Sequence, residues 1–279
     1  MKHPHATVDA LPAYRVRTVN VSINSANKIH DDTTAARYGF RGGLVAGTLV
    51  YAHMTTPLVQ HFGASWLDHS VSELRLLQPA YDGEWLSVDV RRAEGDAGGP
   101  WRAVVHNEAR AELATLETWP EAPLPPVDAR AAMVPAPPGD APIPIHWDAV
   151  HIDAPLRALR WDLSEDDHHA WCKSAGDALP LYQDGEAPRI QPGRVLQGAN
   201  QVFGHHFRLE PWIHTGSRII HRGPLRIGDP VEIRAMPIEK WERKGHQFVT
   251  LYVVFLNGGL PAVEVLHTAI FKVRPLDGA

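Results

Sequence analysis

Two kinds of hydrophobic pattern alternate along the chain. Apolar residues at every second position predict β-strands, because successive side chains of a strand point to opposite faces of a sheet. In the first half this pattern predicts strands at residues 14–22, 70–78, 84–92 and 101–117. Residues 47–62 are largely apolar, which is typical of a buried helix, and Pro57 is expected to kink or end it. A short helix is expected at 31–38, with Asp31 or Asp32 as its N-cap.

The second half repeats this order of elements. Helices are predicted at 164–174, capped by Ser164, and at 195–207. Strands are predicted at 158–163, 212–221, 231–241, 247–256 and 262–273. The charged run at 239–246 contains Gly245 and is expected to form a hairpin connection. A long helix followed by several long antiparallel strands indicates an α+β fold, with a sheet curled around a central helix.

A proline-rich segment divides the two halves. Proline recurs every few residues from Trp119 to Pro144, and its fixed φ and missing N–H exclude a continuous helix or a central strand. The segment is therefore expected to be an extended linker. The predicted organisation is a first domain at 1–118, a linker at 119–148 and a second domain at 149–279.

Local similarities between the halves indicate a duplication. Segment 25–30 has a counterpart at 177–182, and both halves contain the pattern Pro-x-x-x-Gly followed by an acidic residue, at 79–84 and at 224–229. Glycines are also expected to flank the start of each long helix: Gly42 and Gly47 in the first half, Gly193 and Gly198 in the second. Each match alone is weak, because glycine and proline recur at turns for backbone reasons. Their common order is harder to explain by chance.

Composition narrows the class of protein. The formal net charge of −5 gives no electrostatic reason to expect nucleic acid as a partner. The single cysteine, Cys172, is compatible with a reducing compartment, and residues 1–5 show no signal peptide. No segment reaches the roughly 18 uninterrupted apolar residues that a membrane span needs. A cytoplasmic protein is expected.

The chain has 17 histidines, so metal binding has to be considered. His168, His169 and Cys172 lie close together on a predicted helix. A structural zinc site needs a second, correctly spaced pair of ligands, and neither this group nor the pair at 205–206 has one. No metal site is therefore expected.

Three short segments of the first half resemble a known family. The sequence Asn-Lys-Ile-His-Asp-Asp at 27–32, the run Gly-Phe-Arg-Gly-Gly-Leu at 39–44 and Ala-Gly-Thr at 46–48 are similar to the MaoC-like hydratase/dehydratase family, which includes the R-specific enoyl-CoA hydratases. The resemblance implies a double hotdog fold, in which each half is a curled antiparallel sheet around a long helix. It also implies an acyl thioester of coenzyme A or an acyl carrier protein as substrate, no cofactor, and a role in fatty acid metabolism.

The resemblance assigns roles to individual residues. His30 takes the place of the catalytic histidine, and Asn27 that of the asparagine that helps to hold the catalytic segment. The catalytic aspartate of the family falls on Ser25. The amides expected to receive the thioester carbonyl are those of Ala46, Gly47 and Thr48.

The assignment of these amides also has a physical basis. The first amides of a helix lack internal acceptors and carry a positive partial charge, which suits a developing enolate oxyanion. Glycine lets such a group approach the backbone closely. Alternatively, Gly42, Gly43 and Gly47 only permit a tight turn and close packing of helix on sheet.

The missing aspartate places the usual hydratase chemistry in question. Serine can orient a water but cannot accept its proton near neutral pH, whereas His30 could act alone as acid or base. Asp31 or Asp32 could supply the carboxylate, although helix capping explains both more simply. Arg41, like Arg37, could meet coenzyme A phosphates or be a solvated surface residue.

The second half differs from the family pattern in the opposite way. It keeps an aspartate, Asp177, while Leu179 and Tyr182 replace the asparagine and the histidine. Asp177 and His30 are expected to lie at separate places, because equivalent segments of a pseudo-twofold assembly line two different pockets. The second half would then help to shape the acyl tunnel.

Three functions follow from these residues. The leading hypothesis is a carbon–oxygen lyase that hydrates a 2-enoyl-CoA or dehydrates a 3-hydroxyacyl-CoA, with His30 as acid/base. The second is another lyase, isomerase or thioesterase reaction in the same pocket, favoured by Ser25. The third is a non-catalytic acyl-binding subunit whose partner supplies the missing carboxylate. Further pairing of the chain into a homodimer stays open.

Overall fold

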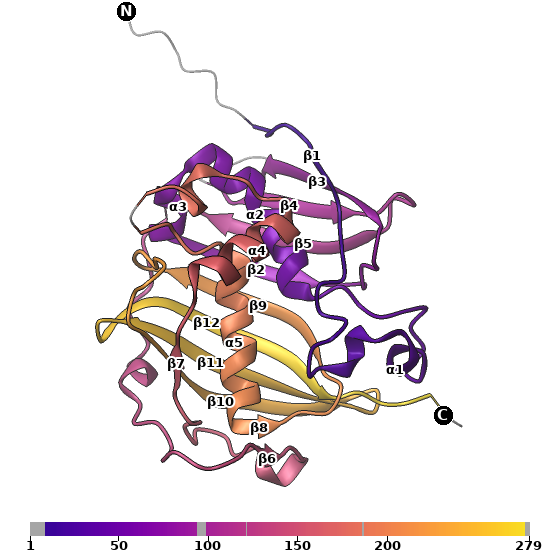
Figure 1. The fold of residues 1–279 in the computed structure, drawn as a ribbon, viewed down its shortest axis with the longest axis vertical. Helices are drawn as coiled ribbons and strands as arrows, with labels where there is room; N and C mark the ends of the chain where they lie inside the picture. Colours follow the sequence, from indigo (N-terminus) through magenta and orange to yellow (C-terminus); the bar gives the residue numbers. More distant parts are fainter. Residues whose placement is uncertain (1–8, 94–98, 121, 186, 277–279) are drawn as a thin grey trace, which may run out of the picture.

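Ten strands of the described chain form one antiparallel sheet (Figure 1). The computed structural model describes residues 9–93, 99–120, 122–185 and 187–276, so the expected absence of a signal peptide at 1–5 lies outside the described residues. The first half contributes β1 (Tyr14–Arg17), β2 (Ser70–Leu76), β3 (Trp85–Arg92), β4 (Trp101–His106) and β5 (Glu112–Trp119). The second half contributes β7 (Leu159–Trp161), β9 (Ile213–His221), β10 (Val231–Arg243), β11 (His246–Asn257) and β12 (Leu260–Lys272). The order across the sheet is β1-β3-β4-β5-β2-β9-β12-β11-β10-β7.

The three longer helices lie on one face of this sheet, and the two longest contact each other (Figure 1). The α-helices are α1 (Asp32–Ala36), α2 (Gly47–Phe62), α3 (Ala64–Asp68), α4 (Glu165–Ala175) and α5 (Pro192–His206). Single 3-10 turns occur at η1 (Lys28–His30), η2 (Ala129–Ala132), η3 (Trp147–Ala149) and η4 (Pro180–Tyr182). A separate two-stranded pair joins β6 (Ile143–Pro144) to β8 (Phe207–Arg208). Each half is therefore a curled sheet with one long helix against it, and the chain has an α+β double hotdog fold, as predicted.

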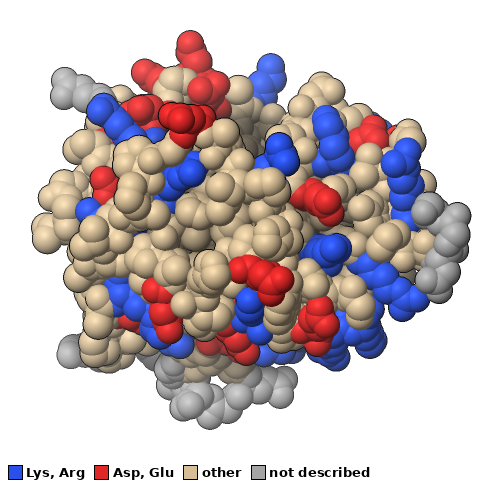
Figure 2. All heavy atoms as spheres, turned by 90° about the horizontal axis from the view of Figure 1, so that it is seen from below, with Lys and Arg blue, Asp and Glu red and all other residues tan. Residues whose placement is uncertain are grey.

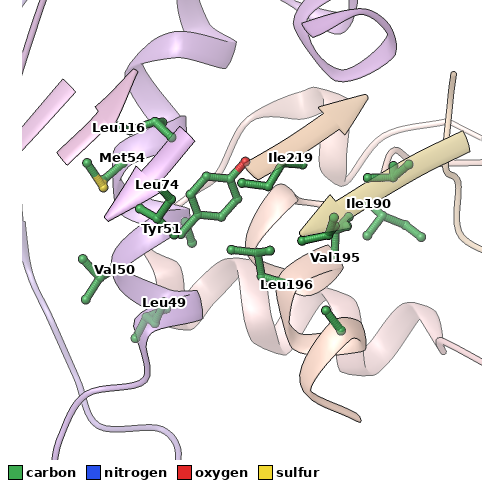
Figure 3. Close-up of a cluster of buried hydrophobic side chains, with 14 of the residues drawn as sticks. Leu49, Val50, Tyr51, Met54, Leu74, Leu116, Ile190, Val195, Leu196 and Ile219 are labelled. Atoms are coloured by element: carbon green, nitrogen blue, oxygen red, sulfur yellow. The ribbon is translucent and has the colours of Figure 1, made fainter. Parts of the chain in front are cut away.

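One hydrophobic core runs through both halves. Figure 3 shows the side chain of Tyr51 from α2 among Leu74 of β2, Ile219 of β9 and Leu196 of α5. These side chains are at most 2% exposed. Burying a side chain of this size stabilises the fold by about 1.5–3 kcal/mol, so contacts across the junction hold the halves together.

The duplicated turns occupy equivalent positions. Gly83 and Gly228, which end the two Pro-x-x-x-Gly patterns, both have positive φ, at 75° and 86°. In each half a residue of this turn forms an isolated bridge to the segment before the long helix: Tyr81 to Leu44 and Arg226 to Arg189. This part of the predicted duplication is confirmed.

Three local predictions were wrong. Residues 101–117 form two strands rather than one, because the chain turns at Arg110 with a φ of 62°. The strand predicted at 14–22 is shorter and ends at Arg17, whereas the helix predicted at 47–62 has these bounds and does not end at Pro57. Gly193 and Gly198 lie inside α5, which begins earlier than predicted, at Pro192, a residue whose fixed φ suits a first helical position.

The proline-rich segment lies against the second half of the sheet. Met133 packs with Tyr252 and Val254 of β11. The guanidinium of Arg222 donates to the carbonyl oxygens of Pro125 and Pro126. The segment thus covers the face of β11 and β12 that is turned away from the helices.

The surface carries charges of both signs. Figure 2 shows Lys and Arg interspersed with Asp and Glu over one face, between areas of uncharged residues. None of the helices in the described ranges is long and apolar enough to cross a membrane.

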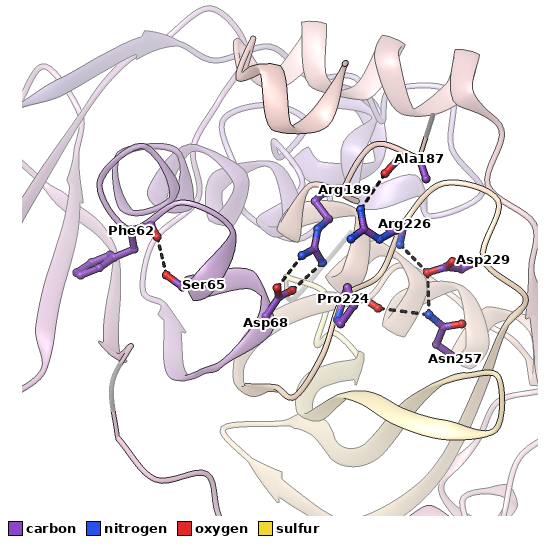
Figure 4. A network of polar contacts seen from close by, with 9 residues as sticks. All are labelled: Phe62, Ser65, Asp68, Ala187, Arg189, Pro224, Arg226, Asp229 and Asn257. Carbon is purple, nitrogen blue, oxygen red and sulfur yellow. Dashed lines mark hydrogen bonds and ion pairs between the residues drawn. The ribbon is translucent and has the colours of Figure 1, made fainter. Parts of the chain in front are cut away.

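An ion pair ties α3 of the first half to the second half (Figure 4). The guanidinium of Arg189 donates two hydrogen bonds to the carboxylate of Asp68, at 2.6 Å each. The Arg189 side chain is 8% exposed, whereas that of Asp68 is 33% exposed. Removing the carboxylate would leave a nearly buried cation without this partner, which is costly.

We predict that Asp68→Ala lowers the free energy of unfolding by about 2 kcal/mol in urea titrations. The control is Asp162→Ala, because Asp162 pairs with Arg160 at the surface, where both side chains are more than three-quarters exposed. That change should cost under about 0.5 kcal/mol. Equal effects of the two substitutions would contradict a stabilising role for the Asp68–Arg189 pair.

Candidate active site

His30 ends a single 3-10 turn whose backbone is held on several sides. The side chain of Asn27 caps η1 by accepting from the N–H of Ile29 at 3.3 Å, and Ile29 itself is buried. The carbonyl oxygen of His30 accepts from Nδ2 of Asn20 at 2.8 Å. A methyl group at Gly43 would lie 2.1 Å from the same oxygen, so glycine is required for this close approach.

The imidazole of His30 has a defined orientation. Its Nδ1 lies 2.6 Å from the carbonyl oxygen of Leu44, which can only accept, so Nδ1 carries the proton in the neutral ring. Its Nε2 then holds a lone pair and lies 3.5 Å from Nδ2 of Asn27. Burial lowers the pKa of His30, and the hydrogen bond to Leu44 partly offsets this. The ring is therefore a neutral base at neutral pH.

Asn27 joins the histidine segment to the second half. Its Nδ2 donates to the carbonyl oxygen of Trp212 at 2.9 Å, and its Oδ1 accepts from the N–H of Trp212 at 3.2 Å. Trp212 directly precedes β9. The position of His30 thus depends on the second half of the chain.

A cavity of about 240 Å³ lies beside His30 and has walls from both halves. Most of its lining is apolar, and the polar groups are few, as in a typical small-molecule site. The first half supplies Asn27, Ile29, His30, Phe40, Leu44, Val45, Ala46, Gly47, Val50, Leu76, Leu77, Gln78, Pro79 and Ala80. The second half supplies Asn200, Trp212, Ile213, His214, Thr215 and Ile270.

The start of α2 forms part of the cavity wall. Ala46 is the N-cap, without a side-chain capping bond, and Ala46 and Gly47 both line the cavity. Thr48, the third residue of the predicted oxyanion site, is 2% exposed and is not among the lining residues. A methyl group at Gly47 would lie 2.3 Å from Cδ1 of Leu76, so this glycine is also needed for packing.

The hydroxyl and carboxylates predicted near His30 have other partners. Ser25 Oγ donates to the carbonyl oxygen of Asn27 at 3.1 Å and does not line the cavity. Asp31 caps α1 by accepting from the N–H of Thr34, which lowers the pKa of its carboxyl group. Asp32 accepts from the N–H of Gly43 at 2.7 Å. None of the three side chains has a hydrogen bond to the imidazole, so each of them shapes the segment rather than touching the cavity.

Arg41 lies in a neighbouring hollow of about 370 Å³, which shares Gln78 and Pro79 with the cavity. Its guanidinium pairs with Glu84 and lies 4.0 Å from the ring centroid of Tyr81. The side chain is 64% exposed and is therefore accessible to a ligand beside the cavity.

Asp177 lies far from His30. Its carboxylate accepts from Thr56 Oγ1 at 3.1 Å and from Gln191 Nε2 at 3.4 Å, and burial raises its pKa. Thr56 is nine residues after Gly47 on α2, about 13 Å along the helix axis. Tyr182, the counterpart of His30, is fully buried in the core. The two segments thus lie at separate places along α2.

Sequence reasoning missed the contribution of β9 to the cavity. Trp212, His214 and Asn200 were not singled out as site residues, although the strand and the helix that carry them were predicted. The duplication indicated related halves, but it did not show which strand ends lie beside His30.

No three metal-binding side chains (His, Cys, Asp or Glu) of the described ranges are grouped closely enough to hold a metal ion. His168 and Cys172 do lie together, with Nε2 and Sγ 3.6 Å apart, but they have no third ligand there.

No protein-family model and no curated protein sequence matches the chain. Solved structures do resemble it. A protein from Chloroflexus aurantiacus assigned as a MaoC domain dehydratase has a TM-score of 0.67 at 11% identity, with 95% of each chain covered. A protein from Mycobacterium tuberculosis with a double hotdog fold has a TM-score of 0.64 at 14% identity, with 94% of each chain covered. A protein from Lactobacillus plantarum assigned as an oleoyl thioesterase has a TM-score of 0.51 at 11% identity, covering 96% of this chain and 98% of the other.

These similarities establish the fold over at least 94% of the chain. The double hotdog fold of this chain is that of solved MaoC-like dehydratases, and it is shared with a thioesterase-type protein.

We predict that Gly43→Ala displaces the backbone of His30, because the added methyl group overlaps its carbonyl oxygen. Overpacking of this kind should lower the free energy of unfolding by about 1–3 kcal/mol, measured by chemical denaturation. Gly223→Ala is the matched control, since a methyl group there would meet no atom within 4 Å. Equal stability of the two variants would contradict the tight packing of Gly43 against His30.

Proposed function

We propose that this protein is an acyl-thioester hydratase/dehydratase of the MaoC-like type, acting on 2-enoyl and 3-hydroxyacyl thioesters with His30 as acid/base. The observation that carries the proposal is the orientation of the imidazole. The hydrogen bond from Nδ1 to Leu44 puts the lone pair on Nε2, which lies at a mostly apolar cavity and has only a long contact of 3.5 Å, with Nδ2 of Asn27. A general base needs this arrangement of lone pair and cavity.

The start of α2 supports the same reaction. The amides at Ala46 and Gly47 border the cavity at the positive end of a 16-residue helix. A thioester carbonyl bound there would have its developing enolate charge stabilised by these donors. Thr48 belongs to the same helix start and can contribute through its backbone, although its side chain is buried.

His30 alone can accept the proton that the water loses and return it to the substrate. In hydration, one proton of the water passes to Nε2 of His30 as the water oxygen bonds to C3, and the C2–C3 π electrons move into the thioester as an enolate. The resulting imidazolium then returns its proton to C2. Dehydration is the reverse sequence. Asn27 holds the histidine segment, and Ser25 supports the backbone of Asn27 without touching substrate.

A thioesterase reaction is the second candidate, favoured by the fold shared with the Lactobacillus plantarum protein. Ser25 does not support it, because its hydroxyl is bonded to the backbone outside the cavity. A non-catalytic acyl-binding subunit is the third. Mass spectrometry after incubation with enoyl-, 3-hydroxyacyl- and saturated acyl-CoA distinguishes the three functions. A hydratase/dehydratase gives hydration or dehydration products, a thioesterase gives free thiol and a carboxylic acid, and a binding subunit gives no turnover.

The carrier and the cellular setting are further parts of the proposal. Arg41 beside the cavity suits a phosphate of coenzyme A or of an acyl carrier arm, in competition with Glu84. A cytoplasmic location and pairing into a homodimer are proposed from the sequence alone.

We predict that His30→Asn lowers kcat/KM for hydration at least about 100-fold, because general acid–base groups contribute this much or more. Asparagine can keep the donor to Leu44 while removing the base at Nε2. His30→Ala should be at least as impaired. His205→Asn, which removes an exposed histidine, should leave the rate unchanged. Full activity of His30→Asn would contradict the assignment of His30 as acid/base.

The pH profile gives a second check. The pKa of His30 is lowered from 6.5 by burial, and only the neutral ring can accept a proton at Nε2. Activity should therefore be constant above this pKa and fall as the pH drops through it. We expect the acidic limb of kcat/KM for hydration to lie below pH 6.5. A limb centred above pH 7 would contradict a buried, neutral His30.

A further inference from the structure

A second histidine lines the same cavity, from the second half of the chain. His214 lies on β9 and is 7% exposed. Its Nε2 lies 3.1 Å from the carbonyl oxygen of Gly216 and 2.8 Å from Ser217 Oγ. Its Nδ1 is buried and has no hydrogen-bond partner. A buried polar atom without a partner costs free energy, so its presence at a cavity points to a ligand.

A β-bulge places this histidine. In the pairing of β9 with β12, His214 faces Ala269 and Gly216 faces Thr268, which leaves Thr215 as an extra residue. Alternation in a regular strand would turn every second side chain away from the cavity. At the bulge, Ile213, His214 and Thr215 all line it. Bulges often redirect side chains beside active sites.

The hydrogen bonds determine what Nδ1 can do. The carbonyl oxygen of Gly216 only accepts, so the proton of the neutral ring lies on Nε2 and Nδ1 is an acceptor. Ser217 Oγ can accept from Nε2 and donate to Nδ1 of His267, 3.1 Å away. The His267 ring stacks on that of His214 with centroids 4.2 Å apart. Burial lowers the pKa of His214 to about 4, which keeps the ring neutral at neutral pH.

The place of Nδ1 suggests its ligand. A methyl group at Gly47 would lie 3.4 Å from this nitrogen, so Nδ1 lies over the first residue of α2. An acceptor there cannot bind the carbonyl oxygen, which has no proton to donate. The C3 hydroxyl of a 3-hydroxyacyl thioester is two carbons from that carbonyl and can donate. Water added to C3 of an enoyl thioester has the same property.

We infer that His214 is a further substrate-positioning residue, whose Nδ1 accepts a hydrogen bond from the C3 hydroxyl of a 3-hydroxyacyl thioester or from the water that becomes it. The inference rests on the proposed function. The contact adds a second polar group to the cavity, in a chain whose Ser25 takes the place of the aspartate that the resemblance implies. In hydration, one water proton passes through His30 to C2, while the other stays on oxygen and points to His214. Every proton is then accounted for, and His214 itself gains none.

Two substitutions separate this role from a structural one. Asparagine in place of His214 keeps a polar atom near the position of Nδ1, whereas glutamine keeps one near that of Nε2. If the contact to the ligand matters, His214→Asn should retain kcat/KM within about threefold and His214→Gln should lose about tenfold. If His214→Gln is instead the more active variant, the hydrogen bond from Nε2 to Gly216 matters more than the contact of Nδ1 with the ligand. That result would overturn the inference. His221→Asn on the same strand controls for removing a buried histidine that does not line the cavity.

Binding measurements distinguish failure of this inference from failure of the proposed reaction. In the His30→Asn background, calorimetry compares a 3-hydroxyacyl thioester with its 3-fluoro analogue, which cannot donate. We expect the hydroxyl compound to bind about tenfold tighter, and this ratio should disappear on adding His214→Gln. A ratio that depends on His214 supports the inference even without turnover by the unmodified protein. A ratio near one in the His30→Asn protein overturns it, even if hydration by the unmodified protein is normal.

Discussion

The pairing of β2 with β9 is the contact on which the rest of the molecule depends. These two strands join two five-stranded halves into one sheet, with Leu74 opposite Ser217 and Arg75 opposite Gly216. A methyl group at Gly216 would lie 2.7 Å from the carbonyl oxygen of Leu74, so the approach requires glycine. Because β9 lies at this junction, the segment that begins it reaches the first half and holds Asn27 there.

The two related segments, at 25–30 and 177–182, lie in different environments. At the start of α2 the packing leaves a cavity with polar groups from both halves, His30 and Asn27 from one and His214 from the other. At the counterpart, Tyr182 fills space in the core and Asp177 is satisfied by Thr56 and Gln191. In the proposed function His30 of the first half transfers the proton, and Trp212 of the second half holds Asn27 beside it. Neither half alone contains the site.

Sequence patterns predicted the fold well because its signals are local. Alternation marked most strands, Asp31 and Ser164 cap the helices as expected, and the run at 239–246 is the β10–β11 hairpin. The turn at Arg110 was missed because residues 101–117 contain neither glycine nor proline, and Asn107, which starts the turn, is a weaker signal. Of the site, His30 and Asn27 were found by motif. His214 was not, because its role depends on a bulge and on pairing across the junction, and no short segment encodes either.

In the proposed reaction, His30 moves a proton between water and C2 of an acyl thioester. Incubating a 3-hydroxyacyl-CoA with the protein in D₂O, followed by mass spectrometry of the recovered thioester, tests it most directly. We expect the pool of hydroxyacyl and enoyl thioester to acquire deuterium at C2, and His30→Asn to abolish this exchange. Release of free coenzyme A with no deuterium at C2 would contradict it.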